Sequence, residues 1–196
     1  MFAHYLGNIK LGMEYVEGDP HTRNAEAAGI PRRPMKNCFY ALLGGAQDYR
    51  LGVTGHGGAG TKKQGEKIRK ALYKTTPGLE ELFVTAEKLL NKNNGWLECI
   101  DGGWVRCPSP HSALLYWFQS GEKCLMSLTA IYVYRGIKKW KLDAKQVGWI
   151  HDELQYDCKD LRTAALVGKL FLSAIERAGR ELKFCIPRAG DTNYGL

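Results

Sequence analysis

The sequence predicts an α/β fold in which helices dominate and the strands form small antiparallel hairpins. Apolar residues recur at helical spacing over residues 76–90 and again over residues 161–182, which predicts two amphipathic helices. Apolar residues also lead into and out of a charged turn within residues 147–158, and Asp101 to Gly103 form the expected turn of a second hairpin over residues 96–105. A chain of 196 residues can bury a sizeable core in one or two units.

Composition and charge narrow the class of protein. Hydrophobic residues make up 44% and charged residues 24% of the chain, which is ordinary for a soluble globular protein and excludes a disordered one. The net charge of +8 suits an anionic partner but points only weakly to nucleic acid. The six cysteines form no C-x-x-C pair, so neither a zinc site nor a disulfide framework is indicated. Without a signal peptide or an apolar run of transmembrane length, we expect a cytoplasmic protein with no membrane partner.

Other helix signals punctuate the rest of the chain. The first 24 residues read as short helices, one of them capped by Asp19 before Pro20. Residues 31–45 form a further expected helix, which Gly44 and the glycine after it end. A long helix is expected from residue 109 to about Tyr134. The inner side of the helix over 161–182 is expected to hold Leu161, Ala164, Ala165, Leu172 and Ile175, and residues 184–186 are expected to form a short strand.

The turn between the two strands of 147–158 is the first candidate site. His151, Asp152 and Glu153 fall between the apolar strand residues. A carboxylate at a hairpin tip is a rigid ligand for a hard divalent cation such as Mg²⁺, which prefers oxygen ligands and keeps several waters. The alternative is a solvated hairpin turn, since polar residues are ordinary in turns.

The helix over 31–45 carries the second candidate site. Arg32, Lys36 and Tyr40 recur every four residues, so one helix face presents a guanidinium, an ammonium and a phenol. Such a face can hold a triphosphate, with Lys36 supplying a proton to departing pyrophosphate and Tyr40 packing on a sugar. The alternative is a solvated basic helix edge. A basic segment from Lys62 to Lys74 allows the same two interpretations, a solvated face or a contact with DNA phosphates.

These segments resemble the family A DNA polymerases, and their surroundings fit the bacteriophage replicative branch of that family. VGWIHDELQYDC resembles motif C, and the spacing of Arg32, Lys36 and Tyr40 resembles motif B of the fingers. Asp19-Pro20-His21 resembles the Asp-x-His segment before the main fingers helix, and SPHSALLYWFQS resembles the helix that runs under the primer-template minor groove. The resemblance covers nearly the whole chain, with the motifs in the family's order.

The resemblance implies a role for each candidate residue. Asp152 and Glu153 are the expected metal ligands of a two-Mg²⁺ site, and Asp152 and Lys36 are the expected catalytic residues. The expected nucleotide-binding residues are His21, Arg32, Lys36 and Tyr40, and the expected DNA-binding residues are Gln119, His151 and His111.

The resemblance also implies a domain plan and an activity. Residues 1–105 are expected to form fingers, with the motif B helix at about 31–45, and residues 106–196 the C-terminal part of the palm, as a fragment of a right-hand polymerase. The implied activity is DNA-directed DNA synthesis from primer-template DNA and dNTPs, in the cytoplasm of a phage-infected bacterium. Motif A, which carries a second metal-binding Asp, is not found in the chain, nor are a thumb or an exonuclease domain. We therefore expect the chain to be inactive alone, either as a gene fragment or as one half of a split polymerase whose partner is a second polypeptide that carries motif A, thumb and exonuclease.

Three departures from the family pattern keep other functions open. Gly44 replaces a tyrosine that stacks at the template base, Gly103 replaces an arginine that contacts the duplex, and Leu115 replaces an asparagine of the minor-groove helix. They favour the alternative of a non-catalytic DNA-binding remnant of a family A polymerase. A further alternative is an unrelated Mg²⁺-dependent hydrolase or nuclease that uses Asp152 and Glu153.

Overall fold

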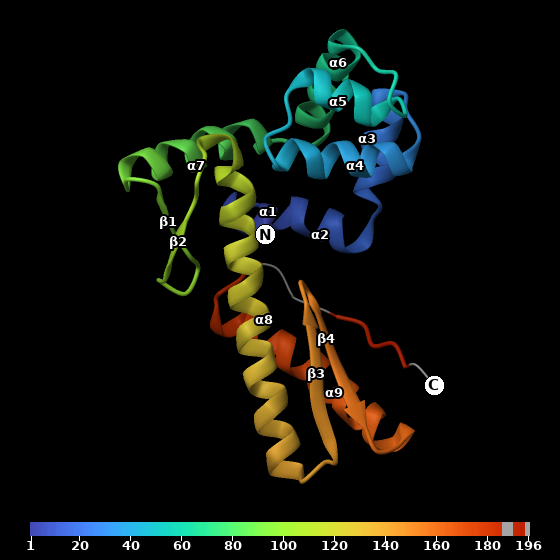
Figure 1. Cartoon of the computed structure of the whole chain (residues 1–196), viewed down its shortest axis with the longest axis vertical. Helices are drawn as coiled ribbons and strands as arrows, with labels where there is room; N and C mark the ends of the chain where they lie inside the picture. Colours follow the sequence, from blue (N-terminus) through green and yellow to red (C-terminus); the bar gives the residue numbers. More distant parts are fainter. Residues whose placement is uncertain (186–189, 195–196) are drawn as a thin grey trace. The chain divides into compact units, whose positions relative to one another are not determined.

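The described part of the chain folds into helices and two short hairpins, which divide into two compact units (Figure 1). The computed structural model describes residues 1–185 and 190–194, except for the side chains of Tyr15 and Val16. The N-terminal unit is Met1–Glu98 with Gly103–Phe118, and the C-terminal unit is Cys99–Gly102 with Gln119–Leu196. The predicted division into residues 1–105 and 106–196 concerns functional subdomains and stays a prediction.

Seven helices and one hairpin, in the described residues, build most of the N-terminal unit. Three of these helices begin where a side chain accepts a free backbone N–H group: Asn8 caps α2, Asp19 caps α3, and Thr61 forms a capping box with Gln64 at α6. The elements are α1 (Phe2–Tyr5), α2 (Ile9–Glu17), α3 (Pro20–Ala28), α4 (Arg32–Leu43), α5 (Asp48–Gly55), α6 (Lys62–Thr75), α7 (Leu79–Lys92), β1 (Trp96–Glu98), β2 (Trp104–Arg106) and the 3₁₀ turn η1 (Pro110–Ser112).

One continuous apolar core holds the N-terminal unit together. Helix α3 packs on α4 and α6, and α5 packs on α4 and α6. The closest approach is between α5 and α6, where Gly65 faces the backbone of Asp48 with no room for a Cβ atom. The most deeply buried apolar side chains come from α4 to α7, from β1 and from the start of the helix that follows η1: Met35, Leu42, Leu51, Ile68, Leu72, Leu79, Leu97 and Leu114.

The C-terminal unit consists of helix, hairpin and helix. Its elements are the greater part of α8 (Ala113–Trp140), β3 (Ala144–Ile150), β4 (Glu153–Cys158) and α9 (Leu161–Glu181). The strands are antiparallel, with a register irregularity between Gln146 and Gly148, and α9 packs against both strands. Along β4 half-buried residues alternate with exposed ones, as the apolar spacing predicts.

Four local expectations are wrong. Helix α8 continues past Tyr134 to Trp140, because nothing before Lys141 breaks the helix. Leu161 is 60% exposed at the first position of α9, whereas Ile175 is buried as expected. Phe184 and Cys185 lie after α9 in no strand, and Ile186 lies outside the described residues.

The fourth wrong expectation concerns the hairpin. Glu153 is the first residue of β4 and pairs with Ile150, so the turn itself consists of His151 and Asp152. A turn this short is common where two strands join directly.

Among the described helices, none combines the length and the apolar character that crossing a membrane requires.

Candidate functional site

The start of α3 and the first turns of α4 bring the predicted nucleotide-binding residues together in the N-terminal unit. Asp19 accepts the backbone N–H groups of His21 and Thr22, each at 3.1 Å. It also accepts Arg32 Nε at 2.7 Å and Arg32 Nη2 at 3.2 Å. This paired guanidinium–carboxylate contact joins the beginnings of the two helices. The Arg32 guanidinium, with help from Thr22, holds the pKa of the Asp19 carboxyl well below its usual range.

His21 lies beside the same helix face. Its ring centre is 5.8 Å from that of Phe39 and 6.0 Å from that of Tyr40. Burial lowers the pKa of His21, and the charges of Lys36 and Arg32 lower it further. The imidazole is therefore neutral at pH 7, with one ring N–H available as a donor.

Lys36 and Tyr40 present their polar ends to solvent, one turn apart on α4. Tyr40 is 53% exposed, and the ion pairs of the described residues do not include Lys36. Arg32, by contrast, already has a carboxylate partner. An incoming phosphate can therefore meet the Lys36 ammonium directly, whereas at Arg32 it can use only the guanidinium N–H groups that Asp19 does not hold, unless it displaces Asp19.

The basic helix α6 differs from its sequence interpretation at one residue. Arg69 Nε contacts Asp48 Oδ1 at 2.5 Å, and Arg69 Nη2 donates to the Ala46 carbonyl at 2.8 Å. This arginine ties α6 to the loop before α5, so it is not a free phosphate ligand. Lys62, Lys63, Lys67, Lys70 and Lys74 are exposed.

The hairpin turn places the predicted metal ligands at one tip in the C-terminal unit. His151 adopts a left-handed backbone with φ 53°, and Trp149 Nε1 donates to its carbonyl at 2.9 Å. These contacts hold the backbone of the turn, while the Asp152 side chain is exposed and accepts no hydrogen bond from another described residue. The neighbouring Glu153 accepts Gln155 Nε2 at 2.7 Å. Asp152 is the more open of the two carboxylates.

Glu122 on α8 is a residue that the sequence interpretation missed. Burial raises the pKa of the Glu122 carboxyl, the negative charge of Asp152 raises it further, and His151 acts in the opposite direction. Glu122 therefore lies close enough to the turn for the charges there to shift its pKa. A signal was present in the sequence, because Glu122 follows Gln119 by three residues and so shares its side of the helix. Gln119 itself is exposed.

The turn offers oxygen ligands of the kind that Mg²⁺ binds, but it offers only two carboxylates. Mg²⁺ typically takes one or two carboxylates from a protein and fills its other positions with water and substrate phosphates. Asp152 and Glu153 supply such oxygens. Within residues 1–185 and 190–194, no group of three or more His, Cys, Asp or Glu side chains is arranged to hold a metal ion. A pair of ions would need further carboxylate ligands.

The candidate residues are divided between the two units. The structure brings His21, Arg32, Lys36 and Tyr40 together in the N-terminal unit, and His151, Asp152 and Glu153 together in the C-terminal unit. His111 is exposed in η1, where it lies against the end of α4: a Cβ atom on Gly45 would overlap the His111 backbone.

Comparison with known proteins identifies relatives across most of the chain. It is 29% identical over 93% of its length to the DNA-directed DNA polymerases of Enterobacteria phage T3 and Escherichia phage T7. A third relative, the DNA-directed DNA polymerase of Escherichia phage Phieco32, is 27% identical over 92% of the chain. The chain is homologous to these phage polymerases and spans about 29% of the length of the T3 and T7 proteins. No family model matches it.

A solved structure has the same fold. The POL domain of Pol1 from M. smegmatis, in complex with DNA primer-template and dNTP, matches 90% of this chain and 34% of its own, with a TM-score of 0.77 and 17% identity. The expected fold is thereby confirmed: a mostly helical α/β arrangement with small antiparallel sheets, like the fingers and palm of a Pol I-type polymerase domain.

Proposed function

We propose that these 196 residues provide the fingers, at about residues 1–105, and the C-terminal part of the palm, at about residues 106–196, of a DNA-directed DNA polymerase. The reaction is the template-directed addition of dNTPs to a primer 3′ end, in the cytoplasm of a phage-infected bacterium. The observation that carries the proposal is that homology to phage DNA polymerases runs through both candidate sites. A basic helix face and an open hairpin carboxylate are the two parts that this chemistry needs.

The face of α4 is proposed to hold the incoming nucleotide. Lys36, without an ion-pair partner among the described residues, supplies a charge for the triphosphate and a proton for departing pyrophosphate. Tyr40 packs on the sugar with its exposed ring. Neutral His21 donates one hydrogen bond to a phosphate oxygen, and Arg32 donates through the guanidinium N–H groups that Asp19 does not hold.

The hairpin tip is proposed to hold the metal side of the reaction. Asp152 would be the first ligand of Mg²⁺ and Glu153 an auxiliary one. When bound, paired Mg²⁺ ions lower the pKa of the primer 3′ hydroxyl and neutralise charge on the leaving group. His151, in the same turn, would lie near the primer end. The left-handed backbone of His151 and the Trp149 hydrogen bond fix the direction in which Asp152 projects.

Gln119 and His111 complete the proposed DNA contacts. Gln119 is exposed on α8 and can donate to, and accept from, base or sugar edges in the minor groove, where the acceptor positions of all correct pairs are similar. His111 is exposed in η1. Both would contact a duplex without reading its sequence.

The second carboxylate of the metal site is proposed to come from a motif A segment outside these 196 residues, in the same polypeptide or in a second one. A single aspartate holds two ions poorly, and groups that act as a unit lose most of their effect together. Thumb and exonuclease functions would likewise be supplied from elsewhere.

A second candidate function, DNA binding without catalysis, is favoured by two of the family departures. Gly44 and Leu115 are neighbours: a Cβ atom on Gly44 would lie 3.8 Å from Leu115 Cδ2. Leu115 packs on the apolar core of the N-terminal unit. Where the family pattern has a tyrosine and an asparagine, this chain has a glycine beside a leucine side chain. One group expected to stack at the template base and one expected in the primer-template minor groove are therefore absent.

Primer extension separates these functions. The chain is incubated with Mg²⁺, four dNTPs and a labelled primer-template, first alone and then with a polymerase segment that carries motif A. Extension only in the mixture supports a polymerase site completed by that segment. Tight primer-template binding with no extension in either reaction would support the DNA-binding remnant, and DNA cleavage without nucleotide use would support the nuclease.

A further inference from the structure

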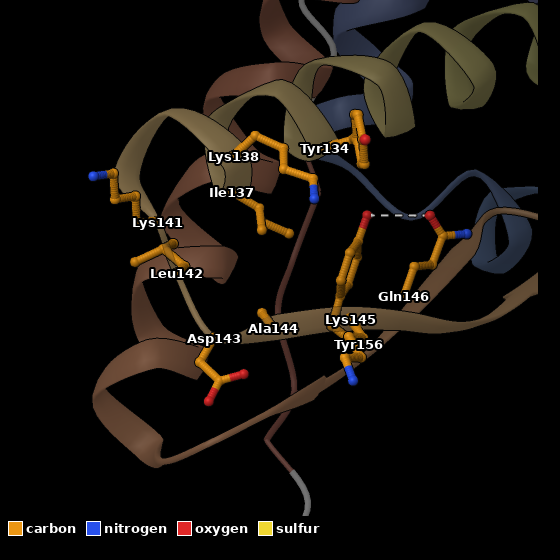
Figure 2. A pocket seen from close by; sticks show the side chains of 10 residues that line it. All are labelled: Tyr134, Ile137, Lys138, Lys141, Leu142, Asp143, Ala144, Lys145, Gln146 and Tyr156. Carbon is orange, nitrogen blue, oxygen red and sulfur yellow. Dashed lines mark hydrogen bonds between the residues drawn. The ribbon is translucent and has the colours of Figure 1, made fainter.

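The C-terminal unit contains a cavity between the last turns of α8 and the hairpin, with a volume of about 610 Å³ (Figure 2). Its lining comes from α8, the α8–β3 connection, the first residues of β3, and Tyr156 of β4. Cavities of roughly 300–1,000 Å³ are the usual size of small-ligand sites. Tyr156 follows Asp152 by four residues along β4, which rises about 3.3 Å per residue, so the near end of the cavity lies roughly 13 Å along the strand from Asp152.

The walls of the cavity suit a flat aromatic ligand. Ile137, Leu142 and Ala144 form an apolar surface, and the Tyr156 ring stands beside it. Tyr134 adds a second ring, 60% exposed at the cavity edge. Two phenol rings next to small aliphatic side chains offer faces on which a nucleobase can stack.

One end of the cavity carries hydrogen-bonding groups that make only long hydrogen bonds with each other and with the backbone. The Tyr156 hydroxyl donates to Gln146 Oε1 at 3.5 Å, and Gln146 Nε2 donates to the Gly148 carbonyl at 3.5 Å. Both distances are at the long limit for a hydrogen bond, so a ligand can replace them at little cost. Burial raises the pKa of Tyr156 to about 12, which keeps its hydroxyl a donor at neutral pH. A glutamine amide presents the paired donor and acceptor that a base edge matches.

Cations lie above and around this cavity. The Lys138 ammonium is 5.6 Å from the centre of the Tyr134 ring, and its side chain extends from α8 over the cavity toward Tyr156 (Figure 2). Lys141 lies at the outer edge, and the ion pairs of the described residues include neither lysine. Residues 134–146 contain one carboxylate, Asp143, against the cations Arg135, Lys138, Lys139, Lys141 and Lys145.

We propose that this cavity binds one nucleotide of single-stranded DNA. The base lies against the Tyr134 and Tyr156 rings with its edge toward Gln146, and the adjoining phosphates lie at Lys138 and Lys141. A continuous strand fits better than a free nucleotide, because the excess of cations extends beyond the cavity and can meet successive phosphates. It fits better than an acidic peptide, because the amide and the two rings match a base. The site goes beyond the proposed polymerase function and does not depend on it.

The first measurement is fluorescence anisotropy of the full chain with a labelled twelve-nucleotide oligothymidylate across a salt series. The double variant Lys138→Gln/Lys141→Gln removes two phosphate contacts, so the slope of log affinity against log salt should fall by about 1.4, at roughly 0.7 per contact for a single strand. The matched control, Lys169→Gln/Lys183→Gln, changes two exposed lysines outside the cavity lining and should keep the parent slope. Equal slopes in the two double variants would overturn the proposal.

The second measurement locates the strand, because an oligonucleotide can also bind at the proposed polymerase site. An oligothymidylate that contains 5-iodouracil is photo-crosslinked to the chain and mapped by mass spectrometry. Crosslinks at Tyr134 or Tyr156 that persist in Asp152→Asn and disappear in Lys138→Gln/Lys141→Gln support the cavity. Crosslinks only at other residues would overturn it. So would displacement of the oligonucleotide by thymidine monophosphate or by an acidic decapeptide at the oligonucleotide's own concentration.

Discussion

The two candidate sites differ in how their charges are partnered within the chain. On α3 and α4, Arg32 is held by Asp19, and His21 is partly buried against the rings of Phe39 and Tyr40. At the hairpin tip, the Asp152 carboxylate is exposed and accepts no hydrogen bond from the described residues. The first site is arranged before any ligand arrives, while the second has an open ligand position.

This difference follows from the chemistry of the two proposed ligands. A triphosphate is bulky and highly charged, so a rigid set of donors on helices recognises it at low conformational cost. A divalent ion is small and binds by replacing water, so a carboxylate that serves it must be free of other strong partners. The chain satisfies both requirements, one in each unit.

The cores of the two units also differ. In the N-terminal unit a single apolar cluster joins helices α1 to α8 with the hairpin. In the C-terminal unit two small clusters, one around Val133 and Val167 and the other around Leu125 and Ile175, join α8 to α9 and the hairpin. The C-terminal unit therefore has less apolar burial to support its open site.

The largest expected effect contrasts the two sites directly. In an extension assay completed with a motif A segment, Asp152→Ala should lower the rate by at least about 10³-fold, because the metal ligands act as a unit. Lys36→Ala should lower nucleotide incorporation by about 10²-fold, through the lost charge and proton donor. Asp157→Asn on the same hairpin and Lys88→Ala, exposed on α7, are the controls and should keep parent rates. Equal activity of Asp152→Ala and the parent would sink the metal assignment.

The next largest effect is on the free energy of unfolding, and it tests the difference between the cores of the two units. Leu72 and Val133 are both completely buried. Leu72→Ala should lower the free energy of unfolding by about 2–5 kcal/mol, and Val133→Ala by about 2 kcal/mol, from lost transfer energy and the cavity that remains. Urea unfolding with amide exchange resolved by residue measures both, with exposed Val84→Ala as the control. A larger loss for Val133→Ala would reverse the comparison.

The pH dependence of Tm tests how much the charge of Asp19 stabilises the site on α3 and α4. The pKa of Asp19 is depressed in the folded chain, so its contribution is present above the ordinary value of 3.8 and is lost as the pH falls through the folded value. Asp19→Asn should therefore lower Tm by a few degrees at pH 7, and the difference should shrink steadily below pH 3.8. Thermal melts from pH 7 to pH 2 test this. Glu26→Gln, exposed on the same helix, is the control, and a pH-independent difference would show that the loss does not come from the charge of Asp19.

The smallest effect concerns the proton of His21. Lys36 is one of the groups that lower its pKa, after burial. Lys36→Gln should raise the pKa of His21 toward the ordinary value of 6.5, and Lys67→Gln should leave it unchanged. Titration of the His21 ring protons by NMR measures the shift. No change in Lys36→Gln would show that Lys36 and His21 do not share one charged surface.

The predictability of the fold rested on strong local signals. Asp19 before Pro20 predicts the start of α3, and the charged stretch between apolar strands predicts the β3–β4 hairpin, because capping and pairing are decided within a few residues. The expected end of α8 at Tyr134 and the buried Leu161 were wrong. Helix length and the choice of the buried face depend on what packs nearby, and periodicity alone does not reveal it.

For the candidate sites too, local spacing was predictable from the sequence and contacts between distant residues were not. Residue spacing placed Arg32, Lys36 and Tyr40 on one face of α4, and it placed Asp152 in a hairpin turn. It did not reveal that Asp48 holds Arg69, because 21 positions separate the two residues. Nor did it reveal that the charge of Asp152 raises the pKa of Glu122, or that Gly44 lies beside the side chain of Leu115.

The sequence by itself determined the Asp19 cap of α3, the β3–β4 hairpin, the order of the motifs and the likeness to family A polymerases, because each rests on local residue patterns. The tertiary structure alone decided which charged groups are partnered and which are open. Arg32 is occupied, Lys36 and Asp152 are available, and a cavity lined by Tyr134, Lys138 and Tyr156 forms where α8 meets the hairpin. Availability depends on distances between residues far apart in the chain, and only the folded packing sets those distances.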